Sequence, residues 1–292
     1  RFAPQPREIT VSVKELQDAM LAVHKLLSRK EMLNDPKALE AVRKEGRGLE
    51  KAQTWLLDTV LERTDLIKRA KETGEKIHMA DLMTIASVKH AELEPARQKM
   101  KGRIVFRGDN TRDEDGAIAV FQELSSSPVT INGVNANIAY GLLPGHSTEQ
   151  ADALQAYVQC YLNSKHKTWV RLPPELWPSD WRGKYRAPMV LLNKSLYGHP
   201  ESGAHWERHL TKAVTDIGGE PVPGHLSTFF FPHWRILLTV YVDDLLASGP
   251  TPNLAAFWAL IGGKVDIGDP EPLNRFLGRN HHIHPLHPGA RR

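Results

Sequence analysis

The sequence predicts a protein of the α+β class, in which helices and strands are combined without a regular βαβ rhythm. Three observations lead to this class. Residues 1–75 are dominated by helical periodicity, and apolar and β-branched segments typical of strands begin at Lys76. From Leu142 onward, short strand-like segments alternate irregularly with helical ones, and no internal repeat is found. We therefore expect sheets backed by helices.

The helical N-terminal region is expected to contain three helices. Residues 13–28 carry an apolar stripe at spacings of three and four, as in an amphipathic helix. Asp35 and Pro36 begin a second helix, because Asp accepts hydrogen bonds from free N–H groups and Pro fits the first turn. This helix is expected to end near Arg47, and residues 49–57 are predicted to form the third.

The remainder of the chain is predicted to form strands and two further helices. The helices are expected over residues 202–217, where Gly218 supplies a C-terminal stop, and over residues 253–261. The His- and Pro-rich end, residues 279–292, is expected to be unfolded. The strand-like segments are residues 76–89, 102–106, 169–172, 189–192, 227–231, 235–242 and 245–248.

Composition limits the classes of function. The 292 residues are 41 % hydrophobic and 25 % charged, which is typical of a globular protein. The net charge of +4 (38 basic minus 34 acidic) permits a polyanionic partner without requiring one. The single cysteine, Cys160, excludes a disulfide framework and a cysteine-based zinc site. The longest apolar run, residues 236–242, is too short to cross a bilayer, so we expect an intracellular protein, cytoplasmic or nuclear, with no membrane partner.

The most informative segment places two adjacent carboxylates, Asp243 and Asp244, between two apolar runs. If both runs are strands, the pair lies at the tight turn of a buried hairpin, where two anions repel each other and their burial is costly. Hard divalent cations such as Mg²⁺ compensate such charges, because carboxylate oxygens are their preferred ligands. The alternative is an ordinary turn pair in solvent.

Six sequence blocks, taken in order, resemble the reverse transcriptases of copia-type LTR retrotransposons. YVDD at residues 241–244 is similar to their active-site hairpin, and KSLYG at residues 194–198, followed by Trp206, is similar to another of their motifs. The other similar blocks are the basic segment at residues 101–108, DALQAYV at residues 152–158, WVRLPP at residues 169–174 and FLG at residues 276–278.

This resemblance implies a right-hand polymerase with fingers and palm over residues 76–278, an antiparallel palm sheet, and a disordered tail over residues 279–292. A thumb would be missing or truncated, because the chain ends shortly after the FLG block. The implied activity is RNA-directed DNA polymerisation. In this reaction, deoxynucleotides from deoxynucleoside triphosphates are added to the 3′ end of a primer on an RNA or DNA template.

The resemblance also implies a catalytic set. Asp152, Asp243 and Asp244 would bind two Mg²⁺ ions, for which Mn²⁺ can substitute. Two-metal nucleotidyl transfer needs carboxylates that converge from separate strands, which Asp152 and Asp243 would provide. Tyr241, which begins the YVDD block, would contact the substrate.

Five further substrate-binding residues are implied by the other blocks. Lys101, Arg103 and Arg107 would contact the triphosphate of the incoming nucleotide. Tyr157 would exclude a 2′-hydroxyl by steric clash; the alternative is a core aromatic. Gly198 would allow the backbone to approach the base pair.

Two further hypotheses arise from departures from the family pattern. HPE at residues 199–201 replaces the common LKQ, and the chain ends before a ribonuclease H domain. One hypothesis is a catalytically inactive retroelement-derived fragment that keeps the fold and binds nucleic acid. The other is that the chain is one part of a longer polyprotein.

Overall fold

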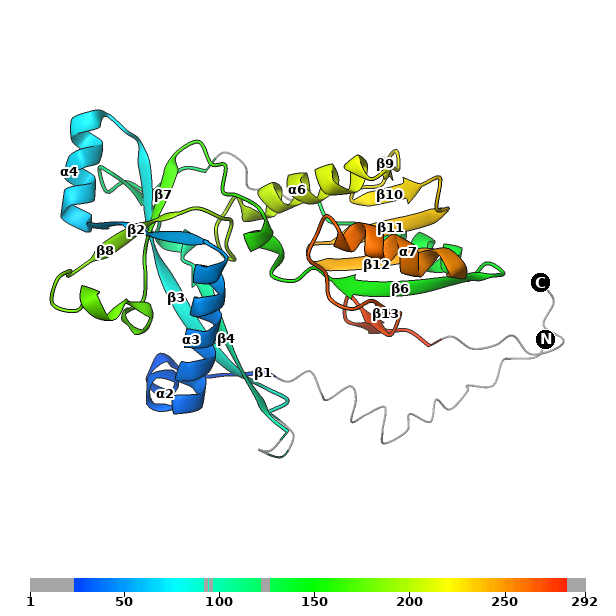
Figure 1. The fold of residues 1–292 in the computed structure, drawn as a ribbon, viewed down its shortest axis with the longest axis horizontal. Helices are drawn as coiled ribbons and strands as arrows, with labels where there is room; N and C mark the ends of the chain where they lie inside the picture. The colour runs from blue at the N-terminus through cyan, green and yellow to red at the C-terminus, as the bar shows by residue number, and fades with distance from the viewer. Residues whose placement is uncertain (1–23, 92–93, 95–96, 122–126, 283–292) are drawn as a thin grey trace, which may run out of the picture. The chain divides into compact units, whose positions relative to one another are not determined.

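The computed structural model describes residues 24–91, 94, 97–121 and 127–282. These residues form a mixed α/β protein, which confirms the expected combination of helices and sheets (Figure 1). They divide into two compact units. The first comprises the described residues up to Ile118 together with Lys167–Leu191, and the second comprises those from Ala119 to His166 and from Leu192 onward. No helix in these ranges is long and apolar enough to cross a membrane.

A seven-stranded sheet organises the first unit, and its longest strand is β3 (Ile77–Lys89). This strand pairs antiparallel with β1 (His24–Leu26), β4 (Lys99–Phe106) and β5 (Arg112–Asp113), and parallel with β7 (Lys167–Arg171). The sheet continues from β7 through β8 (Pro188–Leu192) to β2 (Trp55–Glu62).

Three α-helices accompany this sheet: α2 (Arg29–Asn34), α3 (Pro36–Lys51) and α4 (Arg63–Thr73). α3 begins as expected, because the Asp35 carboxylate accepts hydrogen bonds from the N–H groups of Lys37 and Ala38 at 2.8 and 3.4 Å. The helix lies close to β4, since a Cβ atom at Gly102 would be 2.5 Å from the carbonyl oxygen of Ala41. This contact is possible only at a glycine.

Two expectations for the N-terminal region are wrong. Residues 24–26 form β1 instead of continuing a helix over residues 13–28, whose earlier part lies outside the described residues. The helix expected over residues 49–57 is replaced by the end of α3 and the start of β2. Gln53, with a φ of 56°, follows α3, and pairing of β2 within the sheet outweighs the local helical pattern.

The boundary expected at residue 75 falls inside the first unit. Val42 of α3 and Ala86 of β3 belong to one buried cluster, so the helical region and the strands that follow it share a core. The 3₁₀ helices of the described residues are η1 (Gly108–Asn110), η2 (Ala156–Gln159), η3 (Pro174–Leu176) and η4 (Ser179–Trp181).

A six-stranded antiparallel sheet organises the second unit. Its order is β13 (Glu271–Pro272), β6 (His146–Asp152), β12 (Asp244–Pro250), β11 (Ile236–Tyr241), β10 (Thr228–Phe231) and β9 (Glu220–Pro221). A separate ladder joins β14 (Arg275–Phe276) to β15 (Arg279–Asn280). Arg279 and Asn280 are therefore paired, which corrects the expectation of an unfolded segment that starts at residue 279; residues 283–292 lie outside the described residues.

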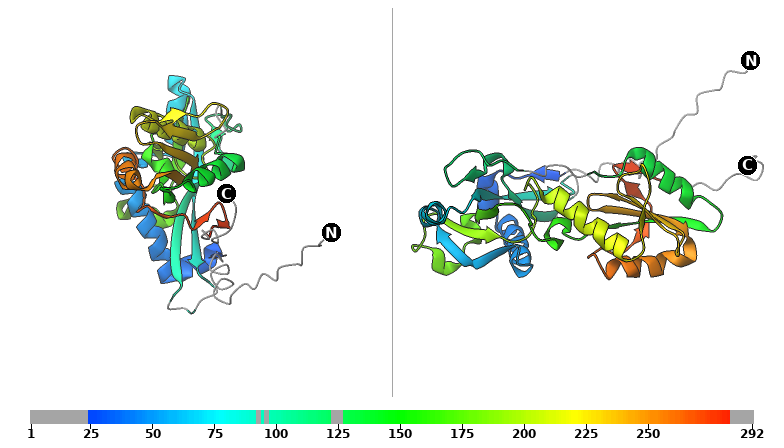
Figure 2. Two further views of the ribbon diagram at one scale, coloured as in Figure 1. Left: turned by 90° about the vertical axis from the view of Figure 1, so that its right-hand side faces the viewer. Right: turned by 90° about the horizontal axis from the view of Figure 1, so that it is seen from above.

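Helices cover both faces of this sheet (Figure 2). α5 (Ile131–Gly141) lies on one face, where Val134 clusters with Leu246 of β12. α6 (Ser202–Asp216) and α7 (Thr251–Gly262) lie on the other, where Leu210 and Phe257 cluster with Leu245. Neighbouring residues of β12 thus face opposite helices, as the two-residue period of a strand requires. α6 and α7 confirm the two helices predicted in this part of the chain.

Candidate active site

Strands β11 and β12 form a hairpin that carries the acidic pair. Tyr241 pairs with Asp244, so Val242 and Asp243 form a two-residue turn. Val242 has a φ of 58°, in the left-handed region that a β-branched residue avoids. Such strain persists only where the surrounding structure holds the residue in place, and it is concentrated at functional sites.

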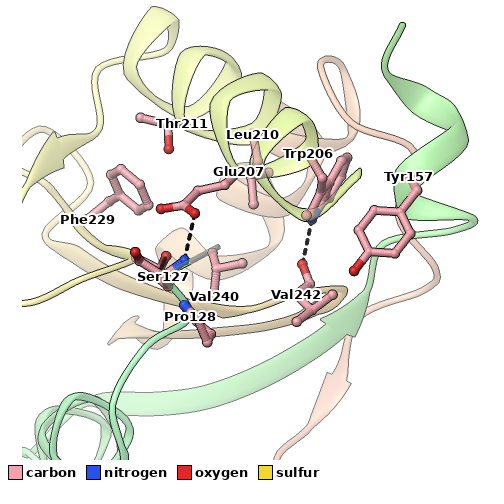
Figure 3. A pocket seen from close by; sticks show the side chains of 12 residues that line it. Ser127, Pro128, Tyr157, Trp206, Glu207, Leu210, Thr211, Phe229, Val240 and Val242 are labelled. Carbon is pink, nitrogen blue, oxygen red and sulfur yellow. Dashed lines mark hydrogen bonds between the residues drawn. The ribbon is translucent and has the colours of Figure 1, made fainter. Parts of the chain in front are cut away.

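Helix α6 supplies a contact that holds this turn. The indole Nε1 of Trp206 donates a hydrogen bond to the carbonyl oxygen of Val242 at 2.6 Å, as Figure 3 shows. Trp206 is 2 % exposed and belongs to the same buried cluster as Val240. The strained turn is therefore fixed by a buried donor from another element.

Strand β6 brings a third carboxylate to the hairpin. Asp152, its last residue, lies directly opposite Asp244 in the β6–β12 ladder, and directly opposed side chains share one face of a sheet. The N–H of Ala153 donates to the carbonyl oxygen of Asp243 at 2.7 Å. The three aspartates predicted from the sequence thus meet at one end of the sheet.

The negative charge of the three carboxylates affects the pKa of Asp244. Burial raises the pKa of its carboxyl group, and the charges of Asp243 and Asp152 and a hydrogen bond with Asp152 raise it further, to about 6. A carboxyl group with this pKa beside two other carboxylates indicates uncompensated negative charge. A bound cation would relieve it.

Two tyrosines lie beside the turn. The hydroxyl of Tyr197 donates to Oδ2 of Asp243 at 3.4 Å, and its ring packs against Tyr157 with the centroids 4.5 Å apart. Tyr157 lies in η2, and burial, followed by the charge of Asp243, raises the pKa of its phenol. Tyr197 was not among the predicted residues; the signal that could have identified it is its place beside Gly198 in the KSLYG block.

The donor set fits a hard divalent cation in charge and in atom type, since three carboxylates are available at one end of the sheet. Within the described residues, however, no group of three or more His, Cys, Asp or Glu side chains is arranged to hold a metal ion. Asp243 accepts from Tyr197, whereas Asp152 lies opposite Asp244 and raises the pKa of that carboxyl group. Joint coordination by the three carboxylates therefore requires side-chain rearrangement.

Gly198 and Tyr241 are both in the second unit with the aspartates. Gly198 has a φ of 89°, a conformation that favours glycine, and it directly follows Tyr197. Tyr241 is 38 % exposed and lies opposite Asp244, so its side chain shares the sheet face of that carboxylate.

Lys101, Arg103 and Arg107 belong to the first unit. Lys101 and Arg103 are two residues apart on β4, so their side chains leave the same face of the strand. Arg107 follows β4 and forms an ion pair with Asp109 at 2.9 Å, which raises the pKa of its guanidinium. These cations are not part of the acidic cluster that the second unit forms by itself.

A small cavity that is open to solvent lies beside the hairpin, between α6 and strands β10 and β11 (Figure 3). Glu207 lines it and accepts a hydrogen bond from the N–H of Ser127 at 2.7 Å. Sequence patterns did not indicate this cavity, because segments remote from one another in the chain form its walls. The apolar part of its lining includes Pro128, Trp206, Leu210, Phe229, Val240 and Val242.

The residues that depart from the family pattern form a buried polar network. The Glu201 carboxylate accepts a hydrogen bond from the hydroxyl of Ser164, and the Glu201 N–H donates to Nδ1 of His199 at 3.2 Å. Glu201 and His199 are 5 % and 4 % exposed. This network precedes α6 directly and anchors the start of the helix that carries Trp206.

Comparison with known proteins supports one family. The Gag-Pol polyproteins of transposons Ty1-LR2 and Ty1-ML2 of Saccharomyces cerevisiae are each 25 % identical to this chain over 236 residues, which is 80 % of the chain and 12 % of each polyprotein. The chain therefore spans about an eighth of the length of these relatives. Residues 82–285 match the family model for "Reverse transcriptase (RNA-dependent DNA polymerase)". This match covers more than half of the chain and includes the acidic hairpin, which confirms the resemblance seen in the sequence: the chain belongs to the reverse transcriptase family of RNA-dependent DNA polymerases.

Proposed function

We propose that this chain is the polymerase core of a copia-type retroelement, which adds deoxynucleotides to a primer on an RNA or DNA template. The observation that carries the proposal is the pairing of Asp152 with Asp244, next to Asp243, at the end of a buried antiparallel hairpin. Family membership supports the class of reaction, and the acidic cluster offers a place for it. In this assignment the first unit corresponds to the fingers and the second to the palm.

Asp152 and Asp243 would hold two Mg²⁺ ions, with Asp244 as the supporting acid. When bound, such ions neutralise charge on the reacting phosphate and the pyrophosphate leaving group. The chain itself contributes positioning: Trp206 donates to the carbonyl of Val242, and the N–H of Ala153 donates to that of Asp243. These two hydrogen bonds hold the backbone of the turn in place before a cation binds.

The residues around the turn would shape the nucleotide site. The ring of Tyr157 is held against Tyr197, and this packing supports a rigid wall that excludes a 2′-hydroxyl. Gly198 has no Cβ atom, so its backbone would allow close approach of the base pair. Tyr241 would contact the substrate. The cations proposed for the triphosphate are Lys101, Arg103 and Arg107.

Primer extension on an RNA template with Mg²⁺ and deoxynucleotides tests the proposal. We expect extension by the parent protein and roughly 10³-fold slower incorporation by Asp243→Asn, because a charged group at the reacting centre is removed. Asp216→Asn is a matched control, since Asp216 is an exposed acid at the end of α6 that pairs with Lys212. Equal extension by Asp243→Asn and the parent would show that the metal assignment is wrong.

A second candidate function is nucleic-acid binding without catalysis. It is favoured by the lack of a closed set of three metal-binding side chains among the residues that the structure describes. Binding of a primer–template without incorporation in either Mg²⁺ or Mn²⁺ would support this function. Metal-dependent incorporation that is lost in Asp243→Asn would exclude it.

A further inference from the structure

Four arginines are partly buried in the described part of the chain, and all four belong to the first unit: Arg63, Arg107, Arg112 and Arg171. Arg107 and Arg171 form ion pairs with aspartates at 2.9 and 2.8 Å. Across the described ranges, the side chains of Arg63 and Arg112 form neither a hydrogen bond nor an ion pair. Arg63 and Arg112 are therefore the two members of this set whose side chains have no partner among the described residues.

Arg63 and Arg112 line the same cavity, which is open to solvent and lies entirely within the first unit. Arg63 reaches it from the first turn of α4, and Arg112 reaches it from β5, opposite Met79 of β3. Asn110 adds an amide to the lining. The other lining residues are Asp81 and the apolar Met79, Ala80 and Met189.

The carboxylate of Asp81 does not neutralise this cavity. Both of its oxygens accept hydrogen bonds from the guanidinium of Arg171, each at 2.8 Å. This bidentate pair occupies both oxygens of Asp81, so the carboxylate is not a hydrogen-bond partner of Arg63 or Arg112. A partly buried guanidinium without a partner has lost hydration without gaining a hydrogen bond, which is unfavourable until an anion binds.

We propose that this cavity binds a phosphate group, held by the guanidinium groups of Arg63 and Arg112 with the Asn110 amide as a third donor. Phosphate suits this site because its oxygens accept paired hydrogen bonds from the planar fork of an arginine. The cavity is open to solvent, so a phosphate can enter while the group that carries it stays outside. No sequence block pointed to this site, since its arginines come from a helix and a strand that are far apart in the chain.

A nucleic-acid backbone and a free nucleotide both offer this phosphate chemistry. Both sources are probed below. The phosphate site itself does not rest on the proposed function.

Binding measurements on the full chain, without divalent metal, test the site. The probes are a labelled single-stranded oligodeoxynucleotide, dATP and inorganic phosphate. We expect Arg63→Gln and Arg112→Gln each to weaken oligodeoxynucleotide binding about tenfold. Each should also make the plot of log K against log salt shallower by about 0.7. Arg182→Gln is the matched control, an exposed arginine of the same unit outside the cavity, and should bind almost as the parent does.

The probes separate the two sources of phosphate. Weaker binding of the oligodeoxynucleotide alone supports a backbone phosphate, and weaker binding of dATP supports the phosphate of a free nucleotide. Unchanged binding of all three probes by both variants would overturn the proposal. The binding measurements contain no divalent metal and no reaction step, so a failure of the catalytic proposal leaves their result unaffected.

A measurement on the parent protein makes the test independent of how the variants fold. Phenylglyoxal modifies accessible arginines, and mass spectrometry identifies the modified positions. We expect the oligodeoxynucleotide to protect Arg63 and Arg112 from modification while Arg182 is modified to the same extent. Equal modification of Arg63 and Arg112 with and without all three probes would contradict the site.

Discussion

Strands β6 and β12 carry two cross-strand polar pairs, with Thr148 opposite Ser248 and Asp152 opposite Asp244. The hydroxyl pair is complete, since its Oγ atoms are 2.8 Å apart and the two residues are 7 % and 0 % exposed. The acid pair lacks a positively charged partner among the residues that the structure describes. Burial and neighbouring negative charges therefore raise the pKa of Asp244 to about 6. The same ladder thus holds one pair that is satisfied within the fold and one that needs a further partner.

The surroundings of the two pairs explain this difference. At the hydroxyl pair there is no room for a ligand, since a Cβ atom at Gly141 would lie 1.8 Å from Oγ1 of Thr148. At the acid pair Asp152 is exposed, and a third carboxylate, Asp243, is next in the turn. Uncompensated charge is therefore found where a cation can approach, which is typical of a binding site.

The largest expected effect is that of Asp152→Asn. Removing one carboxylate of the acid pair should slow incorporation in a primer-extension assay by roughly 10³-fold. Thermal stability should not fall, because a repulsive charge is removed. Thr148→Val, on the same strand, should keep its activity in a folded protein. Normal incorporation by Asp152→Asn would show that the acid pair, like the hydroxyl pair, is not needed for incorporation.

A smaller effect is expected at the hydroxyl pair. Ser248→Ala leaves the buried Thr148 hydroxyl without its partner, which should lower the free energy of unfolding by about 1–3 kcal/mol. Urea denaturation measures this change. The double variant Thr148→Val/Ser248→Ala should recover part of the loss, because no hydroxyl is left unsatisfied. A single variant as stable as the parent would show that the pair does not contribute to stability.

A comparison of two buried tryptophans distinguishes an effect on stability from an effect on the position of the turn. Trp206 donates to Val242 in the turn, whereas Trp258, 3 % exposed in the same core, donates to Oε2 of Glu149 at 2.8 Å. Each Trp→Phe variant should lower the free energy of unfolding by about 1 kcal/mol, the value of one hydrogen bond. Only Trp206→Phe should also slow incorporation at saturating deoxynucleotide. Equal slowing by both variants would refute a positioning role for Trp206.

A further effect is expected in the pH dependence of stability. The pKa of Asp244 in the folded protein, about 6, is above its ordinary value of 3.8, so the folded state binds more protons between these values than the unfolded state. The contribution of this residue to stability therefore decreases as the pH rises from about 4 to about 6. Without divalent metal, Asp244→Asn should remove this decrease and be more stable at neutral pH. Denaturant titrations across this pH range measure the free energy of unfolding. The assignment would be contradicted if this free energy changed with pH to the same extent in the parent and in Asp244→Asn.

Patterns within short segments of the sequence predicted those parts of the site that one continuous segment forms. The YVDD hairpin was predicted because its turn lies between two apolar runs. The helix that became α6 was predicted with Gly218 as its C-terminal stop, and a helix was also expected where α7 is found. Asp152 came from the resemblance of its block, but its register opposite Asp244 is a long-range pairing that no local pattern contains.

What was missed depends on packing between distant segments. The helix expected over residues 49–57 gave way to β2, because pairing in the sheet outweighed its local pattern. The hydrogen bond from Tyr197 to Asp243 and the shared cavity of Arg63 and Arg112 likewise arise only when remote segments meet. No spacing in the sequence encodes such contacts.

The most direct test of the central claim, that three aspartates at the end of this sheet form a metal-dependent polymerase site, is Mn²⁺ binding followed by electron paramagnetic resonance. The protein is titrated in the presence of primer–template and a deoxynucleoside triphosphate. We expect two bound ions for the parent and loss of binding in Asp152→Asn and Asp243→Asn. Undiminished Mn²⁺ binding by both variants would contradict the claim.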